Sequence, residues 1–213
     1  MDLYAYEKEL YSKGINYIGG VDEVGRGPLV GNVVAACCVL PKDFKLEGLT
    51  DSKKLSEKKR DLFYDYIINN CIAYAVGEVS PEEIDEINIY EASRKAMMIA
   101  INEVKKKINL EYVLVDAMPL PNLDIPHIPI IKGDSKSISI AASSVIAKVT
   151  RDRQMYELDK KYPMYEFGKH KGYPTKRHIE NIKKYGLIDG YRKTYGPVKE
   201  ILKEEELKYA INR

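Results

Sequence analysis

Apolar positions along this chain form two patterns: short runs typical of buried strands, and longer stretches with helical spacing. The short runs predict five strands, at residues 17–21, 33–40, 72–79, 112–116 and 128–131. The longer stretches follow capping signals and predict helices over 56–69, from Ser80, over 88–107 and over 135–160. In the first of these helices we expect an apolar stripe made of Leu62, Phe63, Tyr66 and Ile67.

The order of these elements predicts the fold class. Three strands in succession, followed by strands separated by helices, indicate a mixed α/β sheet that is antiparallel first and parallel afterwards, with helices on both faces. With 213 residues and no internal repeat or long Gly, Ser or Pro-rich linker, the chain suits one domain with a possible appendage.

Cysteine usage and hydropathy indicate the cellular compartment that we expect for this protein. The chain has three cysteines, two of them adjacent in a predicted strand, and no C-x-x-C pair, so a disulfide framework is excluded and a reducing compartment is expected. No apolar leader follows Met1, and no apolar run approaches the ~20 residues that cross a bilayer. We therefore expect an unprocessed cytoplasmic protein without a membrane segment.

Charge is unevenly distributed despite a net value of only +2. Residues 132–184 carry 13 Lys and Arg against six acids, so the rest of the chain is acidic. This basic segment is interleaved with Tyr156, Tyr162, Tyr165, Phe167, Tyr173 and Tyr185. Such a mixture suits a nucleic-acid backbone and its bases, and it equally suits a solvated helix face with aromatic rings packed beneath it.

Four acids lie where strands end or helices begin. Asp22 and Glu23 end the first strand, Asp116 ends the fourth, and Asp134 precedes the long helix. Each has a simpler interpretation: a charged hairpin turn for the first two, a turn cap for Asp116 and a helix N-cap for Asp134. Taken together, they occupy the strand ends where α/β sheets form their ligand crevices.

A cluster of four carboxylates favours a divalent metal site. Hard cations such as Mg²⁺ take carboxylate and phosphate oxygens, and a pair of them suits in-line displacement at phosphorus. Asp22 and Glu23 are neighbours on a strand, where side chains alternate between faces, so their joint use requires a local bend or bulge. Gly25 and Gly27, on either side of Arg26, permit such a distortion and a close approach of backbone to substrate.

Motifs along nearly the whole chain resemble the ribonuclease HII family, the type 2 ribonucleases H. They are Gly-Val-Asp-Glu-Val-Gly-Arg-Gly-Pro at 20–28, Asp-Ser-Lys-Lys-Leu at 51–55, Ile-Asp at 84–85 with Asn-Ile at 88–89, Val-Asp at 115–116, Lys-Gly-Asp-Ser at 132–135, Ile-Ala-Ala-Ser-Ser-Val-Ile-Ala-Lys-Val-Thr-Arg-Asp at 140–152 and His-Lys-Gly-Tyr-Pro-Thr at 170–175. The resemblance implies an RNase H-like fold, with a five-stranded mixed sheet flanked by helices as residues 1–160. Residues 161–213 would form a helical substrate-binding extension packed on this core as one structural unit.

The resemblance also implies an activity. The family hydrolyses the RNA strand of RNA/DNA hybrids and cuts 5′ of single ribonucleotides in duplex DNA. It leaves 3′-hydroxyl and 5′-phosphate ends, uses Mg²⁺ or Mn²⁺ at a two-metal site, and serves ribonucleotide excision repair. Its metal-binding and catalytic acids match Asp22, Glu23, Asp116 and Asp134. Its substrate-binding positions match Gly25, Arg26 and Gly27 as reader of the ribose 2′-hydroxyl, Tyr173 at the RNA-to-DNA junction, and Lys53 and Lys54 at phosphates.

Departures from the family pattern and rival functions complete the picture. Tyr191 replaces the usual histidine at the start of the C-terminal motif, and residues 204–213 contain no sliding-clamp motif, so we expect a monomer acting on nucleic acid without a clamp contact. His170 is a candidate for proton transfer, phosphate contact or packing. The alternatives are another RNase H-like nuclease, of resolvase or transposase type, and a non-catalytic nucleic-acid binding module. Comparing an all-DNA duplex with a single-ribonucleotide duplex decides against the first alternative, and activity that chelation abolishes and Mg²⁺ or Mn²⁺ restores excludes the second.

Overall fold

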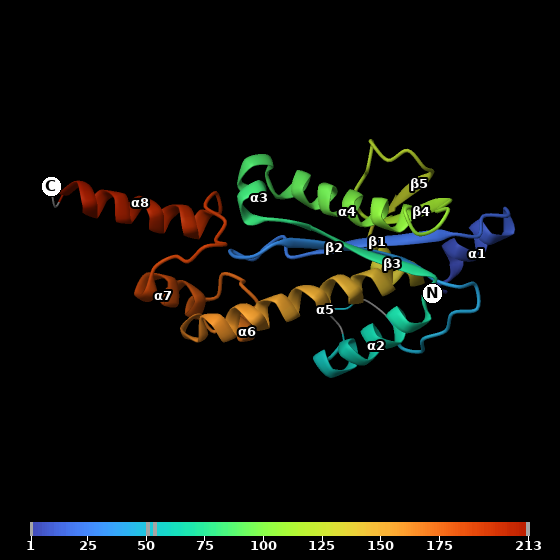
Figure 1. Cartoon of the computed structure of the whole chain (residues 1–213), viewed down its shortest axis with the longest axis horizontal. Coiled ribbons are helices and arrows are strands. Elements are labelled where there is room, and N and C mark those ends of the chain that lie inside the picture. Colours follow the sequence, from blue (N-terminus) through green and yellow to red (C-terminus); the bar gives the residue numbers. More distant parts are fainter. Residues whose placement is uncertain (1, 50–51, 53–54, 212–213) are drawn as a thin grey trace.

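The computed structural model describes residues 2–49, 52 and 55–211, and its centre is a five-stranded sheet of order β3-β2-β1-β4-β5 (Figure 1). The strands are β1 (Ile18–Val24), β2 (Val33–Val39), β3 (Ala73–Val79), β4 (Tyr112–Asp116) and β5 (His127–Ile130). Antiparallel pairing joins β1 to β2 and β2 to β3, whereas β4 runs parallel to both β1 and β5. The predicted mixed sheet is therefore confirmed.

Helices cover both faces of the sheet and gather at its ends. They are α1 (Ala5–Ser12), α2 (Glu57–Asn70), α3 (Pro81–Ile87), α4 (Ile89–Lys105), α5 (Ile138–Lys161), α6 (Phe167–His170), α7 (Lys176–Tyr185) and α8 (Gly196–Ile211), with short 3₁₀ turns η2 (Gly133–Ser135) and η3 (Pro163–Tyr165). In Figure 1, α3 and α4 lie on one face and α5 and α2 on the other, while α6, α7 and α8 lie at the end away from α1. Among the described residues, no helix is long and apolar enough to cross a membrane.

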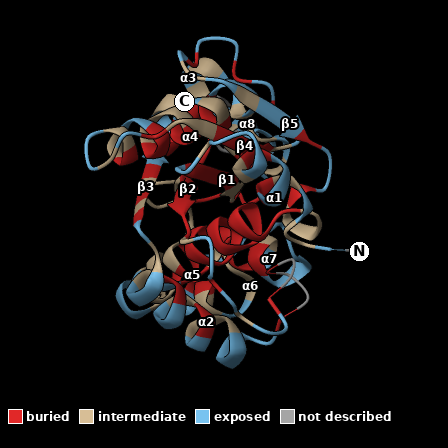
Figure 2. Ribbon diagram, turned by 90° about the vertical axis from the view of Figure 1, so that its right-hand side faces the viewer, coloured by how far each residue is buried: buried red, intermediate tan, exposed pale blue. Residues whose placement is uncertain are grey.

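Burial is concentrated where the sheet meets α4 and α5 (Figure 2). On the α4 face the core includes Val21, Met97 and Val113, and on the α5 face it includes Ala36, Cys38 and Val145. Two strand glycines allow the helices to approach backbone to backbone, which fixes the position of each helix over the sheet. A Cβ at Gly20 would lie 2.1 Å from the Ser139 carbonyl carbon of α5, and one at Gly77 would lie 2.1 Å from the Ala96 carbonyl oxygen of α4.

The N-terminal helix α1, which the apolar pattern did not predict, holds the start of α5. Glu7 is 1% exposed, and its Oε1 accepts hydrogen bonds from Ser137 Oγ (2.6 Å) and from the Ser139 N–H (3.1 Å). The Ile138 N–H donates to the Leu3 carbonyl at 2.8 Å. Donors at a helix N-terminus need such partners when they are buried, so α1 fixes the end of α5 that adjoins η2.

The C-terminal segment packs on the connection between β1 and β2. Tyr165, Phe167 and Tyr191 share a buried cluster with Leu29 and Val30 of that connection. A short bridge pairs Val30 with Tyr191. Residues that follow α5 are thereby joined to the chain that directly follows the first two acids.

Three local predictions are wrong in detail. Ser137 caps α5 through the Ile140 N–H, so the long helix begins at Ile138, and Asp134 lies in η2 instead of capping it. On α2, Leu62 is 60% and Tyr66 42% exposed, because the stripe that packs inward is the narrower pair Phe63 and Ile67. The last strand is His127–Ile130, which leaves Ile131 outside the sheet and 72% exposed.

Candidate active site

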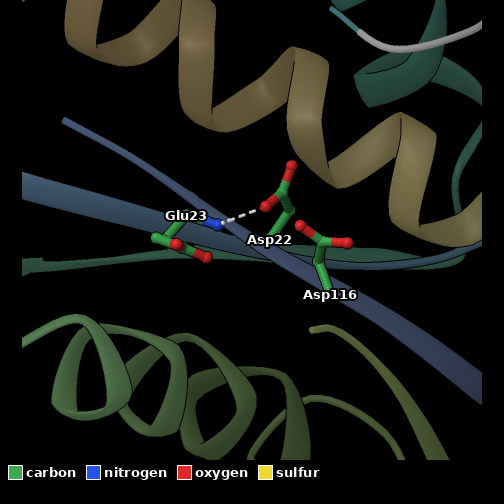
Figure 3. Close-up of side chains that lie close together, drawn as sticks. All are labelled: Asp22, Glu23 and Asp116. Carbon is green, nitrogen blue, oxygen red and sulfur yellow. Dashed lines mark hydrogen bonds between the residues drawn. The ribbon is translucent and has the colours of Figure 1, made fainter. Parts of the chain in front are cut away.

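Three of the four predicted acids meet at the carboxyl ends of β1 and β4. Asp22 and Glu23 lie at the end of β1, and Asp116 ends its parallel neighbour β4 (Figure 3). One carboxylate oxygen from each of the three lies within 4.8 Å of the others. The carboxyl ends of neighbouring parallel strands share one edge, which explains why acids 93 or more positions apart in sequence converge.

Neighbouring side chains reach this cluster without a bulge. We expected a bend or a bulge here. The β1–β2 register runs unbroken from Gly19↔Val39 to Val24↔Val34, so β1 has no bulge against β2. Figure 3 shows Asp22 pointing toward α5 and Glu23 lying on the opposite side of β1. The parallel pairing of β1 with β4 ends at Val21↔Val115. Asp22 follows that pair on β1 and Asp116 follows it on β4, so the three carboxylates meet where the pairing of the two strands stops.

Main-chain donors orient the acids. The Glu23 N–H donates to Asp22 Oδ1 at 2.8 Å, and the Gly133 N–H donates to Asp116 Oδ1 at 2.6 Å. The second bond joins Asp116 to η2, which carries Asp134. Since the Asp116 carboxylate accepts from this distant backbone, its side chain is not the local turn cap that the sequence left open.

The acids of the cluster repel one another electrostatically. Asp22 is only 7% exposed. Burial raises the pKa of its carboxyl well above the ordinary value, and the negative charges of Glu23, Asp116 and Asp134 raise it further. Asp134 is half-buried and lies outside the group of three, yet it is close enough to act on Asp22. A divalent cation with oxygen ligands would offset this repulsion, so the donor set fits Mg²⁺ or Mn²⁺.

The loop after β1 lies beside these acids. Gly25 has φ +92°, and a Cβ there would lie 2.3 Å from Arg151 Nε, so only glycine fits. Arg26 is exposed and its Nη1 lies 3.6 Å from Glu23 Oε1. A Cβ at Gly27 would lie 3.1 Å from Tyr173 Cε1. The predicted glycine loop and the predicted junction tyrosine are therefore in contact.

Two stacked histidines support Tyr173. The rings of His170 and His178 lie 4.1 Å apart at 17°. His178 Nδ1 bonds to the Tyr173 carbonyl and its Nε2 to the Tyr191 hydroxyl, both at 2.8 Å, and the Tyr173 N–H donates to the His170 carbonyl at 2.9 Å. Burial lowers the pKa of His178 to about 4. Of the roles considered for His170, this geometry favours packing.

The basic segment divides into exposed and buried parts. Tyr173 and Tyr185 are 41% and 45% exposed, whereas Tyr165 and Phe167 are core residues whose rings stack at 5.2 Å. Arg151 is fully buried, so the segment is not a uniform substrate face. Lys53 and Lys54 lie outside the described residues.

Sequence reasoning missed the groups that hold the glycine loop. Arg192 donates to the carbonyls of Gly25 and Arg26 (2.7 and 3.1 Å), and the Tyr195 hydroxyl also donates to Arg26 (2.6 Å). Arg151, on α5, donates to the carbonyls of Val30 and Asn32 a few residues after this loop. The sequence contains one signal for Arg151. It lies four residues from both Ala147 and Met155, which places it on the apolar face of a long helix.

Comparisons with known proteins identify the family of this chain. The family model described as Ribonuclease HII matches residues 19–195. Ribonuclease HII of Bacillus cytotoxicus is 53% identical over 205 residues, which are 96% of this chain and 78% of the relative. The ribonuclease HII of Caldanaerobacter subterraneus subsp. tengcongensis is 57% identical over 198 residues, 93% of this chain and 80% of that one.

A solved structure shows the same architecture. The ribonuclease H2 from Pyrococcus horikoshii superimposes with a TM-score of 0.74 at 30% identity, covering 88% of this chain and 98% of the other. The mixed sheet flanked by helices is therefore the RNase H-like fold. Because the family model matches residues 19–195 and these relatives are 53–57% identical, the chain belongs to the ribonuclease HII family of endoribonucleases, enzymes that hydrolyse RNA in RNA/DNA hybrids.

Proposed function

We propose that this ribonuclease also cuts duplex DNA on the 5′ side of a single embedded ribonucleotide, leaving 3′-hydroxyl and 5′-phosphate ends, and so serves ribonucleotide removal in DNA repair. The observation that carries this proposal is the contact between Tyr173 and the loop 25–27. This loop follows the acids Asp22 and Glu23 closely in sequence. A lone ribonucleotide offers one distinguishing hydroxyl and one RNA-to-DNA junction. This site has a candidate group for each.

The acids would supply the metal site. Asp22, Glu23 and Asp116 offer oxygens within 4.8 Å of one another, and we propose Asp134, whose charge acts on Asp22, as the fourth ligand. When bound, two Mg²⁺ or Mn²⁺ ions would favour in-line attack of water on phosphorus and stabilise the leaving oxygen. The protein orients these ligands through the Glu23 and Gly133 N–H groups.

The loop and the extension would bind substrate. We assign the 2′-hydroxyl to the backbone of Gly25, Arg26 and Gly27, because glycines let a main chain approach a ribose closely. Arg26, which is exposed, can contact a neighbouring phosphate. The half-exposed ring of Tyr173 offers a stacking surface for the adjoining nucleotide. Residues 161–213 would act as the substrate-binding extension of a core formed by residues 1–160, with Lys53 and Lys54 at further phosphates.

The test compares two duplexes that differ by one oxygen atom. Purified protein is incubated with duplex DNA carrying one ribonucleotide and with the all-DNA duplex, with Mg²⁺, with Mn²⁺, and with chelator. We expect cleavage of the first duplex alone, lost in chelator and restored by either ion, with a single cut 5′ of the ribonucleotide. Cleavage of both duplexes would favour a resolvase-type nuclease, and metal-dependent binding without cleavage would favour a binding module.

A further inference from the structure

Arg192 holds the carbonyl side of the loop that follows the first two acids. It is fully buried, and its guanidinium donates to the carbonyl oxygens of Gly25 (Nη2, 2.7 Å), Arg26 (Nη1, 3.1 Å) and Gly31 (Nη2, 2.8 Å; Nε, 3.1 Å). The Tyr195 hydroxyl donates to the Arg26 carbonyl (2.6 Å) and accepts from Arg192 Nη1 (3.0 Å). Arg192 and Tyr195 therefore donate to main-chain oxygens within residues 25–31, and Arg192 also donates to Tyr195.

Arg151 secures the same segment from the opposite element. It is also fully buried, and from α5 it donates to the carbonyls of Val30 (3.1 Å), Asn32 (3.2 Å) and Lys171 (3.0 Å). The loop is therefore held between two guanidinium groups. Burial lowers the pKa of Arg192, and a hydrophobic side chain at that position would avoid this electrostatic cost. Because burying the charge of Arg192 is costly, we look for its role in the hydrogen bonds that it makes to the loop.

Peptide geometry converts this contact into an orientation. In a trans planar peptide the C=O and N–H groups point in opposite directions. Because Arg192 takes the carbonyls of Gly25 and Arg26, the N–H groups of Arg26 and Gly27 in those same peptides point away from it. Those two donors therefore point away from the buried guanidinium, and the second of them belongs to Gly27, which Tyr173 borders.

We propose that Arg192, assisted by Tyr195, is the positioning residue for ribose recognition: it takes the inward carbonyls of the loop so that the N–H groups of Arg26 and Gly27 meet the 2′-hydroxyl oxygen. The inference rests on the proposed function of the loop. An arginine suits the role because its planar fork of donors engages three carbonyls at fixed angles. A lysine would keep the charge and lose that geometry.

The experiment separates hydroxyl recognition from general binding. For the full chain and its variants, kcat/KM is measured on the single-ribonucleotide duplex, and the all-DNA duplex is titrated as a competitive inhibitor in the same buffer. We expect Arg192→Lys to lower kcat/KM about tenfold and Tyr195→Phe about threefold, while the inhibition constant of the all-DNA duplex stays within twofold. Arg94→Lys, on α4 and paired with Glu91, lies outside the loop and outside residues 161–213, so it is the control and should change neither quantity.

Each outcome bears on one proposal alone. If wild-type protein does not cut the ribonucleotide duplex, the proposed function fails before any variant is compared. If it does, parallel changes in kcat/KM and in the inhibition constant, or no change in a folded variant, overturn the role of Arg192. Thermal unfolding monitors folding. Should Arg192→Lys not fold, Tyr195→Phe decides the question, because wild-type kcat/KM in that variant overturns the proposal.

Discussion

Replacing Gly20 by alanine should damage catalysis by displacing α5. Gly20 lies two residues before Asp22, and its added Cβ would lie 2.1 Å from the Ser139 carbonyl carbon and 2.3 Å from the Ile140 nitrogen, where ordinary contact begins at 3.4 Å. Both obstacles are backbone, so the helix has to retreat by about 1.3 Å, the difference between 2.1 and 3.4 Å. The displaced end of α5 follows η2 and would move Asp134 relative to Asp22. A misplacement of about 1 Å lowers turnover on the order of 100-fold.

Gly77→Ala is the matched control. Its Cβ would lie 2.1 Å from the Ala96 carbonyl oxygen on the α4 face, which is the same clash in a strand that carries none of the four acids. Overpacking should destabilise each variant by about 1–3 kcal/mol, measured by urea denaturation. In folded protein we expect kcat to fall about 100-fold for Gly20→Ala and to stay within about threefold for Gly77→Ala. Equal losses of kcat, or wild-type turnover in Gly20→Ala, would refute the argument that helix position sets the acid geometry.

Four further predictions address the acids, the tyrosine and the charge. Asp116→Asn should abolish turnover and keep duplex affinity within about tenfold, while Asp124→Asn, an exposed acid paired with Lys105, should retain activity; wild-type cleavage by Asp116→Asn would contradict the metal-site assignment. Tyr173→Ala should lose preference for the lone ribonucleotide more than Tyr173→Phe does, and identical preferences would exclude stacking. Binding should weaken steeply with salt, whereas a flat response would mean that the basic segment faces away from the substrate. Because the pKa of Asp22 is raised in the folded state, its ionised form destabilises the metal-free fold above that pKa, and stability rises as pH falls through the raised pKa toward the ordinary value of 3.8. Asp22→Asn should therefore raise the Tm of metal-free protein at neutral pH, by an amount that shrinks on acidification; a lower Tm at neutral pH would contradict the sign.

The sheet and the acid positions were predictable because their signals are local. Apolar runs and capping residues such as Ser80 define strands and helices within a few positions. Parallel strands then bring their carboxyl ends together, which places Asp116 beside Asp22 without knowledge of any contact. The exposed Leu62 shows the limit of this reasoning, since an apolar residue next to a buried stripe has the same pattern as one inside it.

The contacts of Arg192 with the glycine loop and those of α1 with α5 were not predictable, because the partners are distant in sequence. Glu7 bonds to Ser137 across 130 positions, and Arg192 bonds to Arg26 across 166. No hydrophobic period links such pairs. A buried arginine also runs against the burial preference of its type, so Arg192 looks like a surface residue until its carbonyl partners are in place.

The bond between Arg192 and Gly25 joins positions 167 apart and has a consequence for the order of synthesis. A nascent chain emerges from the ribosome with all four acids long before Arg192 appears. Until then the glycine loop lacks the guanidinium that takes its carbonyls, even if the sheet beneath it has already formed. If Arg192 positions the loop as proposed, ribose selectivity arises only late in synthesis, and a product truncated before Arg192 would carry the four acids without the group that orients the loop.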